Sequence, residues 1–572
     1  MKKYEFVFFA ISLCVVLVFP WPTLPGEGLT LTVNLFVWVW TSCCALFLLF
    51  KFRRSQLKSN QAVILLLAGA LFMTLPAFWT DATYLYQACY RLAALWGMIV
   101  FAFLLMQRSF TGAGREAIYG VIVLLGLVQT LLAAWQILGA YSAVIYPGYD
   151  FVLANGRPWG SFLQVNLLAS FLATGLLCAF WLAIRASKYA SGWWLSAILI
   201  VAGLTITESR TGGLGATIGL IGLLISCRSK RVCFFITLAV LFGVLAGKGV
   251  LMLRPDQLKA SAQVVSSGGK LSTVTDHRPL NTDERMEWNR QHSGAERRVM
   301  IAGSLIMIAQ RPMLGFGLGS FESQFPLTLA IHGLRNPFTV TVAHPHNELL
   351  YVWSEGGILA FVGLLLCLLV LTRPFFSWRS ASSAVLMLPL LMHMMTEYPF
   401  YLSAVHAVML VILFCAAFQG DDKAFQPLPP VVDRGIKMGI LIAGLAAVIF
   451  MSTGLQSALR IFQFEHGKFA HPELLTAVSN PWAQPDRLRF DRAISDLVQF
   501  NVRRDPALLQ DFRQQADKWL SRHNDANLIA TMVQVGVFLD ESGKGFWNQR
   551  GCMSFPQDPR FTCNWKGGMT DE

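Results

Sequence analysis

Two imidazoles, an amide and a carboxylate stand together in His344-Pro345-His346-Asn347-Glu348, between a polar loop and an apolar stretch. Polar groups at such a boundary raise the free energy of a membrane protein unless they are paired or used. Because proline favours the first turn of a helix, we expect His346 at the N-terminus of the helix that follows. The helix dipole there disfavours an imidazolium, so a neutral His346 could accept a proton from a hydroxyl group or orient it. The alternative is two interfacial histidines satisfied by water or the backbone.

Arginines stand near the ends of other apolar stretches. Arg210, in Glu208-Ser209-Arg210-Thr211, is expected at headgroup depth, where a guanidinium can bind a phosphate in bidentate fashion. The alternative is an arginine that extends toward lipid headgroups without a specific ligand. Arg91 lies inside an apolar stretch near one end, and an arginine there is a candidate functional residue.

Two more polar groups border apolar stretches. Arg157, Gln164 and Asn166 precede one, and Glu397 and Tyr398 follow another. Hydropathy alone does not favour these residues there. For the tyrosine the alternative is the aromatic belt of a membrane interface.

The composition indicates an all-α polytopic membrane protein. Of 572 residues, 55% are hydrophobic and 14% are charged, whereas soluble domains carry about 25% charged residues. About thirteen apolar stretches approach or exceed the length needed to cross a bilayer. They lie near residues 4–20, 29–50, 61–79, 86–106, 117–140, 165–184, 193–208, 212–227, 232–250, 348–371, 382–399, 402–419 and 436–456.

The distribution of cations predicts the orientation. Alternate short loops carry lysines and arginines, among them Lys51, Arg108, Arg185 and Arg231. Since cytoplasmic loops are enriched in these residues, we expect a cytoplasmic N-terminus, with the long loop 251–347 and the C-terminus on the opposite side. The first apolar stretch has no small-x-small cleavage site.

The net charge of +13 does not indicate a nucleic-acid partner. Residues 456–572 contain 14 Lys and Arg and 14 Asp and Glu, so the excess lies in the membrane portion. Of the eleven cysteines, most lie in or beside apolar stretches. Cys552 and Cys563 lie in the polar tail, where an oxidising compartment would favour a disulfide; two free thiols are the alternative.

The chain divides into four parts. We expect an N-terminal transmembrane bundle at 1–250, a large loop at 251–347, C-terminal transmembrane helices at 348–456 and a small helical domain at 457–572. Within the loop, residues 296–309 indicate an amphipathic helix with a basic start at Arg297 and Arg298, ended by Pro312. The glycine-rich residues 312–321 lack the lysine and the strand–helix setting of a phosphate-binding loop.

The topology places the candidate groups on one side of the membrane. We expect them to converge at the outer leaflet in a cationic pocket at headgroup depth, which suits a pyrophosphate and the charge that develops as it leaves. The converging residues are Arg91, Arg157, Arg210, Arg297, Arg298, His344, His346 and Tyr398.

At these motifs, over roughly residues 150–400, the chain resembles the Wzy/WaaL superfamily of polysaccharide polymerases and O-antigen ligases. It looks most like the PglL-type protein O-oligosaccharyltransferases. The matching pieces, in order, are Trp159-Gly160-Ser161-Phe162 with Gln164 and Asn166, Ser209-Arg210-Thr211-Gly212, Glu296-Arg297-Arg298, 312–321, His344 to Glu348 with Glu355-Gly356-Gly357, and Glu397-Tyr398-Pro399.

The resemblance implies a GT-C-like bacterial inner-membrane glycosyltransferase with a periplasmic catalytic loop and C-terminal domain. It implies transfer of a glycan from undecaprenyl pyrophosphate to an acceptor hydroxyl, without a metal or other cofactor. His346 would correspond to the essential loop histidine, Tyr398 to the important tyrosine, and Arg210 and Arg298 to the pyrophosphate-binding arginines. The doublets Arg297/Arg298 and His344/His346 leave the assignment within each pair open, and Asn347, Glu397, Gln164 and Asn166 would be supporting polar groups.

The acceptor is expected to be a periplasmic protein such as a pilin, glycosylated on Ser or Thr. The nearest alternative is an O-antigen ligase, whose acceptor is lipid A-core, and a Wzy-type polymerase comes third. A transporter or flippase would show internal repeats and discontinuous helices at the middle of the membrane, whereas the polar groups here gather at one rim.

Overall fold

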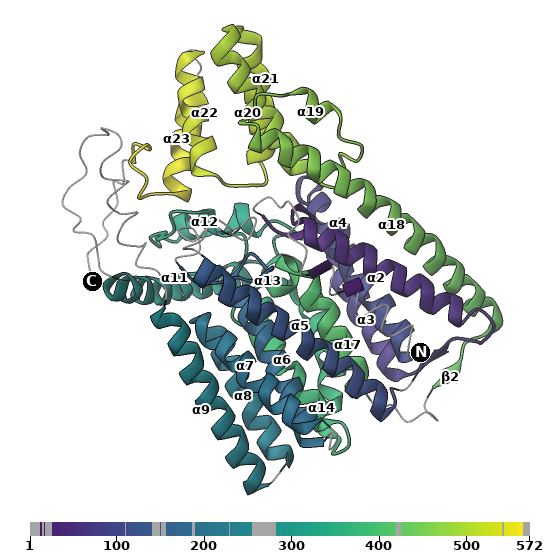
Figure 1. The fold of residues 1–572 in the computed structure, drawn as a ribbon. Coiled ribbons are helices and arrows are strands. Elements are labelled where there is room, and N and C mark those ends of the chain that lie inside the picture. The colour runs from purple at the N-terminus through teal and green to yellow at the C-terminus, as the bar shows by residue number, and fades with distance from the viewer. Residues whose placement is uncertain are drawn as a thin grey trace. The chain divides into compact units, whose positions relative to one another are not determined.

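The computed structural model describes residues 12–13, 16–17, 26–108, 110–139, 149, 156–185, 189–227, 229–253, 282–418, 425–539 and 543–563, and for 282–293 the backbone alone. Within these ranges the chain is almost entirely helical, and its only strands, β1 (Lys58–Ser59) and β2 (Gln426–Pro427), pair antiparallel (Figure 1). The predicted all-α fold is confirmed. The chain forms two compact units: unit 1 contains residues 1–64, 97–290 and 368–449, and unit 2 contains 65–96, 291–367 and 450–572.

Nine helices in the described ranges are long and apolar enough to cross a membrane, as expected for a multi-pass protein. They are α2 (Thr32–Lys51), α3 with η2 (Gln61–Phe78), α4 (Ala82–Met106), α5 (Gly112–Leu138), α6 (Val165–Arg185), α8 (Arg210–Cys227), α9 (Lys230–Met252), α13 with η4 (Glu348–Phe376) and α18 (Pro430–His466). A short 3-10 turn, η1 (Gly28–Thr30), precedes α2.

Three predicted spans correspond to shorter apolar helices. These are α7 (Ala190–Ile206), the run of α14 (Ala381–Ala384), η5 (Val385–Met387) and α15 (Leu388–Met394), and α17 (Ala404–Ala417). The expected continuous helix at 382–399 is therefore interrupted, and the last part of that range precedes the short α16 (Pro399–Leu402). The predicted span at 4–20 lies outside the described residues, apart from 12–13 and 16–17.

Helix α6 is the centre of unit 1. It packs against α5, α7 and α8, and 94% of its most apolar window is buried. Such enclosure explains why α6 is apolar on all sides. Helices α7 and α9 approach closely because α9 has Gly243 and Gly247 in the contact, where a Cβ atom would come within 2.5 Å of Val201 and 2.6 Å of Thr205.

In unit 2, the region around Glu355 is built on a break in α13. Gly357 has φ 67°, which interrupts the helix, and the glycine-rich segment 312–321 supplies the missing backbone hydrogen bonds. Phe316 N donates to Ser354 O and Gly317 N to Glu355 O, while Ile358 N donates to Pro312 O. Gly315 must lack a side chain, because its φ is 68° and a Cβ would lie 2.3 Å from Glu355 O. The sequence analysis did not predict this discontinuous helix.

The long loop contains two helices in the described residues. Helix α11 (Thr282–Gln310) ends where predicted but begins earlier, and α12 (Phe321–Ile331) packs on it at Gly303. Residues 254–281 of the predicted loop lie outside the description. Arg297 and Arg298 are both exposed on α11, on the face that also exposes Ile301 and Leu305.

The C-terminal part of unit 2 is a helical domain. It contains α19 (Glu473–Thr476), α20 (Pro485–Arg503), α21 (Pro506–Leu520), α22 (Ala526–Phe538) and α23 (Gly543–Ser554) (Figure 1). Its core contains apolar residues of these helices, among them Phe500, Leu509 and Phe512. A disulfide joins Cys552 to Cys563, the pair that the sequence indicated.

Candidate functional site

The two histidines of the loop motif have different surroundings. His344 is buried, whereas His346 is half-buried and adopts a left-handed backbone conformation with φ 56°. The backbone N–H of His346 donates to Nδ1 of His344 over 2.9 Å. A non-glycine residue in this region is strained unless its surroundings hold it there. The ring of His344 therefore fixes the backbone that carries His346.

The proton of His344 can be located from its neighbours. Because Nδ1 accepts a backbone N–H, the neutral ring carries its proton on Nε2, which lies 3.5 Å from Oε2 of Glu348. Burial lowers the pKa of His344 to about 4, against the opposing effect of Glu348. His344 is thus a neutral residue within the loop, and its ring nitrogens face protein groups.

Helix α13 begins where the predicted stretch 348–371 begins, but the expected place of His346 in its first turn is wrong. Its first residue is Glu348, and Asn347 caps it, since Leu350 N donates to Oδ1 of Asn347 over 3.1 Å. His346 therefore precedes the cap instead of occupying the first helical turn. The reason is its left-handed backbone, which cannot continue into a helix, whereas an asparagine is a favoured N-cap.

Arg91 has a buried anionic partner. Its Nη1 lies 3.1 Å from Oε2 of Glu355, and its guanidinium lies 5.0 Å from the ring centroid of Tyr351. The carboxylate of Glu355 also accepts from the backbone N–H groups of Gly319 and Phe321. Arg91 therefore fastens α4, α13 and the glycine-rich segment, so part of its charge is compensated inside the protein.

The contacts of Tyr351 connect this ion pair to the histidine motif. The ring of Tyr351 lies 4.2 Å from that of His344, between centroids. We call the connected set Arg91, His344, Glu348, Tyr351 and Glu355 the His344 cluster. It holds the strained backbone of His346 at the start of α13.

Unit 1 contains a second polar cluster. The carboxylate of Glu397 accepts from Nε2 of Gln164 over 2.8 Å and from Nδ2 of Asn166, and Nε2 of His393 lies 3.1 Å away. Glu397 is 5% exposed and His393 is fully buried. We call these residues, with Ser209, the Glu397 cluster. Gln164 and Asn166, which the sequence indicated as supporting polar residues, therefore both donate to the carboxylate of Glu397.

The segment that carries Arg157 and Gln164 is held by α5. Gln136 of that helix accepts from the backbone N–H groups of Trp159 and Gly160, and Gln129 binds Ser161. Arg157 itself is half-buried. Neither glutamine was predicted as a site residue, although two amides on an apolar helix are a visible signal in the sequence.

Arg210 is the exposed first residue of α8, and Tyr398 follows the Glu397 cluster in the chain. Because these groups belong to unit 1 and the two loop histidines belong to unit 2, the expected common pocket stays a prediction.

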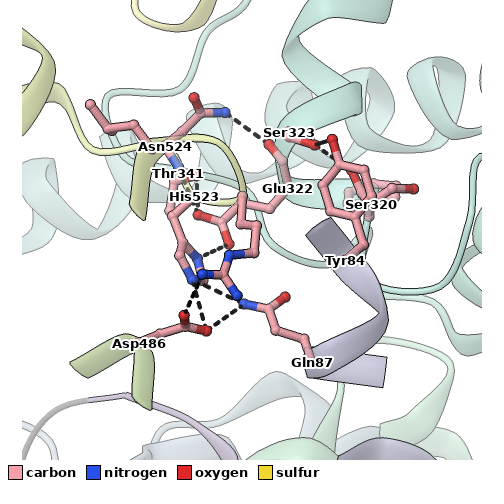
Figure 2. Close-up of polar contacts among 12 residues, drawn as sticks. Tyr84, Gln87, Ser320, Glu322, Ser323, Thr341, Asp486, His523 and Asn524 are labelled. Atoms are coloured by element: carbon pink, nitrogen blue, oxygen red, sulfur yellow. Dashed lines mark hydrogen bonds and ion pairs between the residues drawn. The ribbon is translucent and has the colours of Figure 1, made fainter. Parts of the chain in front are cut away.

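A third cluster, in unit 2, was missed by the sequence analysis. His523 lies between two carboxylates: its Nδ1 is 2.9 Å from Glu322 and its Nε2 is 3.3 Å from Asp486 (Figure 2). Burial opposes a charge on His523, but the two carboxylates outweigh it and raise its pKa to about 10. Gln87 and Arg522 add further contacts to Asp486. We call these residues the His523 cluster.

Among the described residues, no group of three or more His, Cys, Asp or Glu side chains is arranged to hold a metal ion. The three polar clusters are instead built from ion pairs and hydrogen bonds between side chains.

Comparison with known proteins gave two family matches. Residues 195–365 match a family model described as O-antigen ligase, and residues 382–541 match one described as virulence factor membrane-bound polymerase, C-terminal. No curated protein matched. The two matches support the superfamily of O-antigen ligases and membrane polymerases, and with it a glycan-transferring activity. His346, Arg210 and Glu397 lie inside the matched segments, whereas Arg91 and Arg157 precede them.

Proposed function

We propose, from the superfamily that these matches support, that the chain transfers a glycan en bloc from undecaprenyl pyrophosphate to Ser or Thr hydroxyls of a periplasmic protein such as a pilin. The observation that carries the proposal is the contrast between the two loop histidines. His344 is buried with its nitrogens turned to protein groups, and His346 is partly exposed on a backbone that His344 holds.

In this proposal His346 receives a proton. The acceptor hydroxyl oxygen attacks the anomeric carbon of the lipid-linked glycan, and the bond from that carbon to the pyrophosphate oxygen breaks. The hydroxyl proton passes to the imidazole of His346, which later releases it to water, and the pyrophosphate leaves on its lipid. A neutral imidazole is needed before the step and a charged one forms during it. His344 is a positioning residue here.

The exposed arginines are proposed to bind the pyrophosphate. Arg210, Arg297 and Arg298 are exposed, so each keeps a guanidinium available to a ligand. Arg91 is different, because Glu355 already compensates its charge. We therefore propose a positioning role for Arg91 and a direct one for the other three. For Arg157 and Tyr398, contact with the donor remains a proposal from the resemblance.

The acceptor and the setting are also part of the proposal. Lipid A-core is the second candidate acceptor, favoured by the description of the family that matches residues 195–365. We propose an inner-membrane location, with the N-terminus in the cytoplasm and the loop and C-terminal domain in the periplasm. The proposed reaction needs no metal, so transfer is expected to continue in EDTA.

The test uses a Gram-negative host that lacks its own ligase. The full chain is co-expressed with a defined lipid-linked glycan, with and without a candidate pilin, and sugar is followed on protein and on lipopolysaccharide. Sugar on the pilin supports the proposal, and sugar on lipid A-core alone supports the ligase alternative.

The variant His346→Ala is expected to abolish transfer while the protein stays in the membrane. The matched control is His471→Ala, since the side chain of His471 is 62% exposed and pairs with the exposed Glu473. Wild-type transfer by His346→Ala would overturn the proposed role of His346.

A further inference from the structure

We infer that His393 is a positioning residue that fixes the start of α8, and with it Arg210, through the carboxylate of Glu397 and the amide of Asn166. The inference rests on the proposed function only where it assigns Arg210 to the donor pyrophosphate. Its structural part concerns residues of unit 1 alone.

The donors and acceptors around His393 can be assigned by starting from His406, on α17. Its Nε2 lies 3.0 Å from the backbone carbonyl of Leu167, which can only accept, so this nitrogen carries a proton. The same nitrogen lies 3.2 Å from Oγ of Ser170. Oγ of Ser403 lies 2.8 Å from Nδ1, where the neutral ring of His406 needs a donor. His406 is thus oriented from both sides.

Ser170 contacts both His406 and His393. Oγ of Ser170 lies 2.8 Å from Nδ1 of His393 and 3.1 Å from the carbonyl of Leu167, so its one proton can go to either. Nε2 of His393 carries a proton because it faces Oε2 of Glu397, an acceptor, at 3.1 Å. His393 is fully buried, and both of its ring nitrogens are used, so it is placed to orient Glu397 and not to touch a substrate.

The carboxylate of Glu397 then fixes Asn166. An ionised carboxylate only accepts hydrogen bonds, so Glu397 takes the amide N–H groups of Gln164 and Asn166 together with the N–H of His393. This leaves Oδ1 of Asn166 directed at Ser209, whose hydroxyl donates to it over 2.7 Å. A flipped amide would set its oxygen against the carboxylate of Glu397, and two acceptors cannot form a hydrogen bond.

Ser209 connects Asn166 to the first turn of α8. Its Oγ accepts from Gly212 N over 3.1 Å, and its backbone carbonyl accepts from Gly213 N, which is the pattern of an N-cap. Arg210 is the first residue of the helix that is capped in this way. The turn before it is strained, because Glu208 has φ 51°, so the cap has to be held from outside the turn.

The first test measures amide hydrogen exchange at residues 209–213 in the full chain in nanodiscs. With His393→Leu we expect exchange of the Gly212 and Gly213 amides to become about tenfold faster, the effect of losing one hydrogen bond. His393→Gln should restore most of the protection, because its amide N–H₂ group can replace the donor to Glu397. The control Ser196→Ala removes a buried hydroxyl from α7, where it bonds Gly192 O, and should leave this region unchanged.

The second test is a double-mutant cycle on glycan transfer. His393→Leu is expected to raise the KM for the lipid-linked donor about tenfold with a smaller change in kcat. If His393 acts through Arg210, the pair His393→Leu/Arg210→Ala should be no worse than Arg210→Ala alone.

The outcomes separate this inference from the proposed function. Unchanged exchange at 209–213 in His393→Leu, or losses that add fully with Arg210→Ala, would overturn the positioning role. Absence of glycan transfer by the wild type would overturn the proposed function, while the exchange measurement would still decide the role of His393.

Discussion

Two histidines of unit 2, the buried His344 and the partly buried His523, hold opposite charge states. Burial disfavours a charge on both rings. Even so, the pKa of His344 is lowered to about 4 and that of His523 is raised to about 10. At neutral pH the first ring is neutral and the second is an imidazolium. Burial alone therefore does not decide the charge of a histidine in this protein.

The difference comes from what each ring nitrogen faces. His344 has a backbone N–H on one nitrogen and one carboxylate, Glu348, at 3.5 Å from the other. His523 has a carboxylate on both sides, Glu322 and Asp486, and the side-chain amide of Gln87 also lies 3.0 Å from its Nε2. The backbone N–H that points at Nδ1 of His344 excludes a proton on that nitrogen. The two carboxylates that face His523 favour a proton on each of its ring nitrogens. The neutral ring holds a loop backbone in place, and the charged ring fastens helices α12 and α20 to one another.

The largest effect is expected from removing the charged ring. His523→Leu would leave the partly buried carboxylates of Glu322 and Asp486 without the cation they share. Losing one partner of a fully buried pair costs about 3–5 kcal/mol, which is the upper bound here because Arg522 still contacts Asp486. Thermal unfolding of the purified full chain in detergent, together with limited proteolysis of the C-terminal domain, measures the change.

The control for this prediction is His471→Leu. His471 and Glu473 form an ion pair whose side chains are 62% and 69% exposed, and such pairs contribute little. A His523→Leu protein as stable as that control would show that the two carboxylates do not need the imidazolium.

The contrast between the two histidines also marks what could be predicted from sequence. His344 belongs to a local motif, so its composition revealed it. The partners of His523 lie 201 and 37 positions away, and a lone histidine in a polar tail gave no signal. Arg91 was recognised, but Glu355, its partner 264 positions away, was not assigned to it.

For the fold, too, features that depend on contacts between distant residues could not be predicted from the sequence. Apolar length predicted the helices of the bundle, and the sequence also predicted a small helical domain at 457–572. The break at Gly357 was not predicted, because it depends on backbone groups of residues 312–317 that replace the lost helical hydrogen bonds. His393 and Glu397 lie at i and i+4, which was a readable signal, but a histidine on an apolar helix did not by itself indicate a partner.

Replacing His344 is expected to lower the stability of the protein less than replacing His523. His344→Leu removes the acceptor of the His346 N–H and should destabilise the protein by about 1–3 kcal/mol, the cost of an unsatisfied buried donor. His344→Asn retains an acceptor oxygen close to the position of Nδ1 and should lose less stability. In the proposed function it should also retain more transfer activity than His344→Leu.

Thermal unfolding and the transfer assay measure both variants of His344 side by side. Equal losses in His344→Leu and His344→Asn would mean that the hydrogen bond to His346 N does not matter, and that the ring acts through its volume alone.

The two rings should also affect stability in opposite pH ranges, with a slope of at most about 1.4 kcal/mol per pH unit for each. His523 has a folded pKa of about 10, above the ordinary value of 6.5, so its contribution is complete below pH 6.5 and is lost as the pH rises through 10. His344 has a folded pKa of about 4, so its contribution is present above pH 6.5 and is lost as the pH falls through 4.

Thermal unfolding across both ranges can separate these contributions from those of other titrating groups, provided each variant is compared with the wild type. His523→Gln should flatten the decline between pH 6.5 and 10. His344→Asn should flatten the decline between pH 6.5 and 4 and leave the alkaline side unchanged. If either variant kept the wild-type slope in its own range, the charge assigned to that ring would be wrong, because a residue without a titrating proton cannot reproduce the linkage.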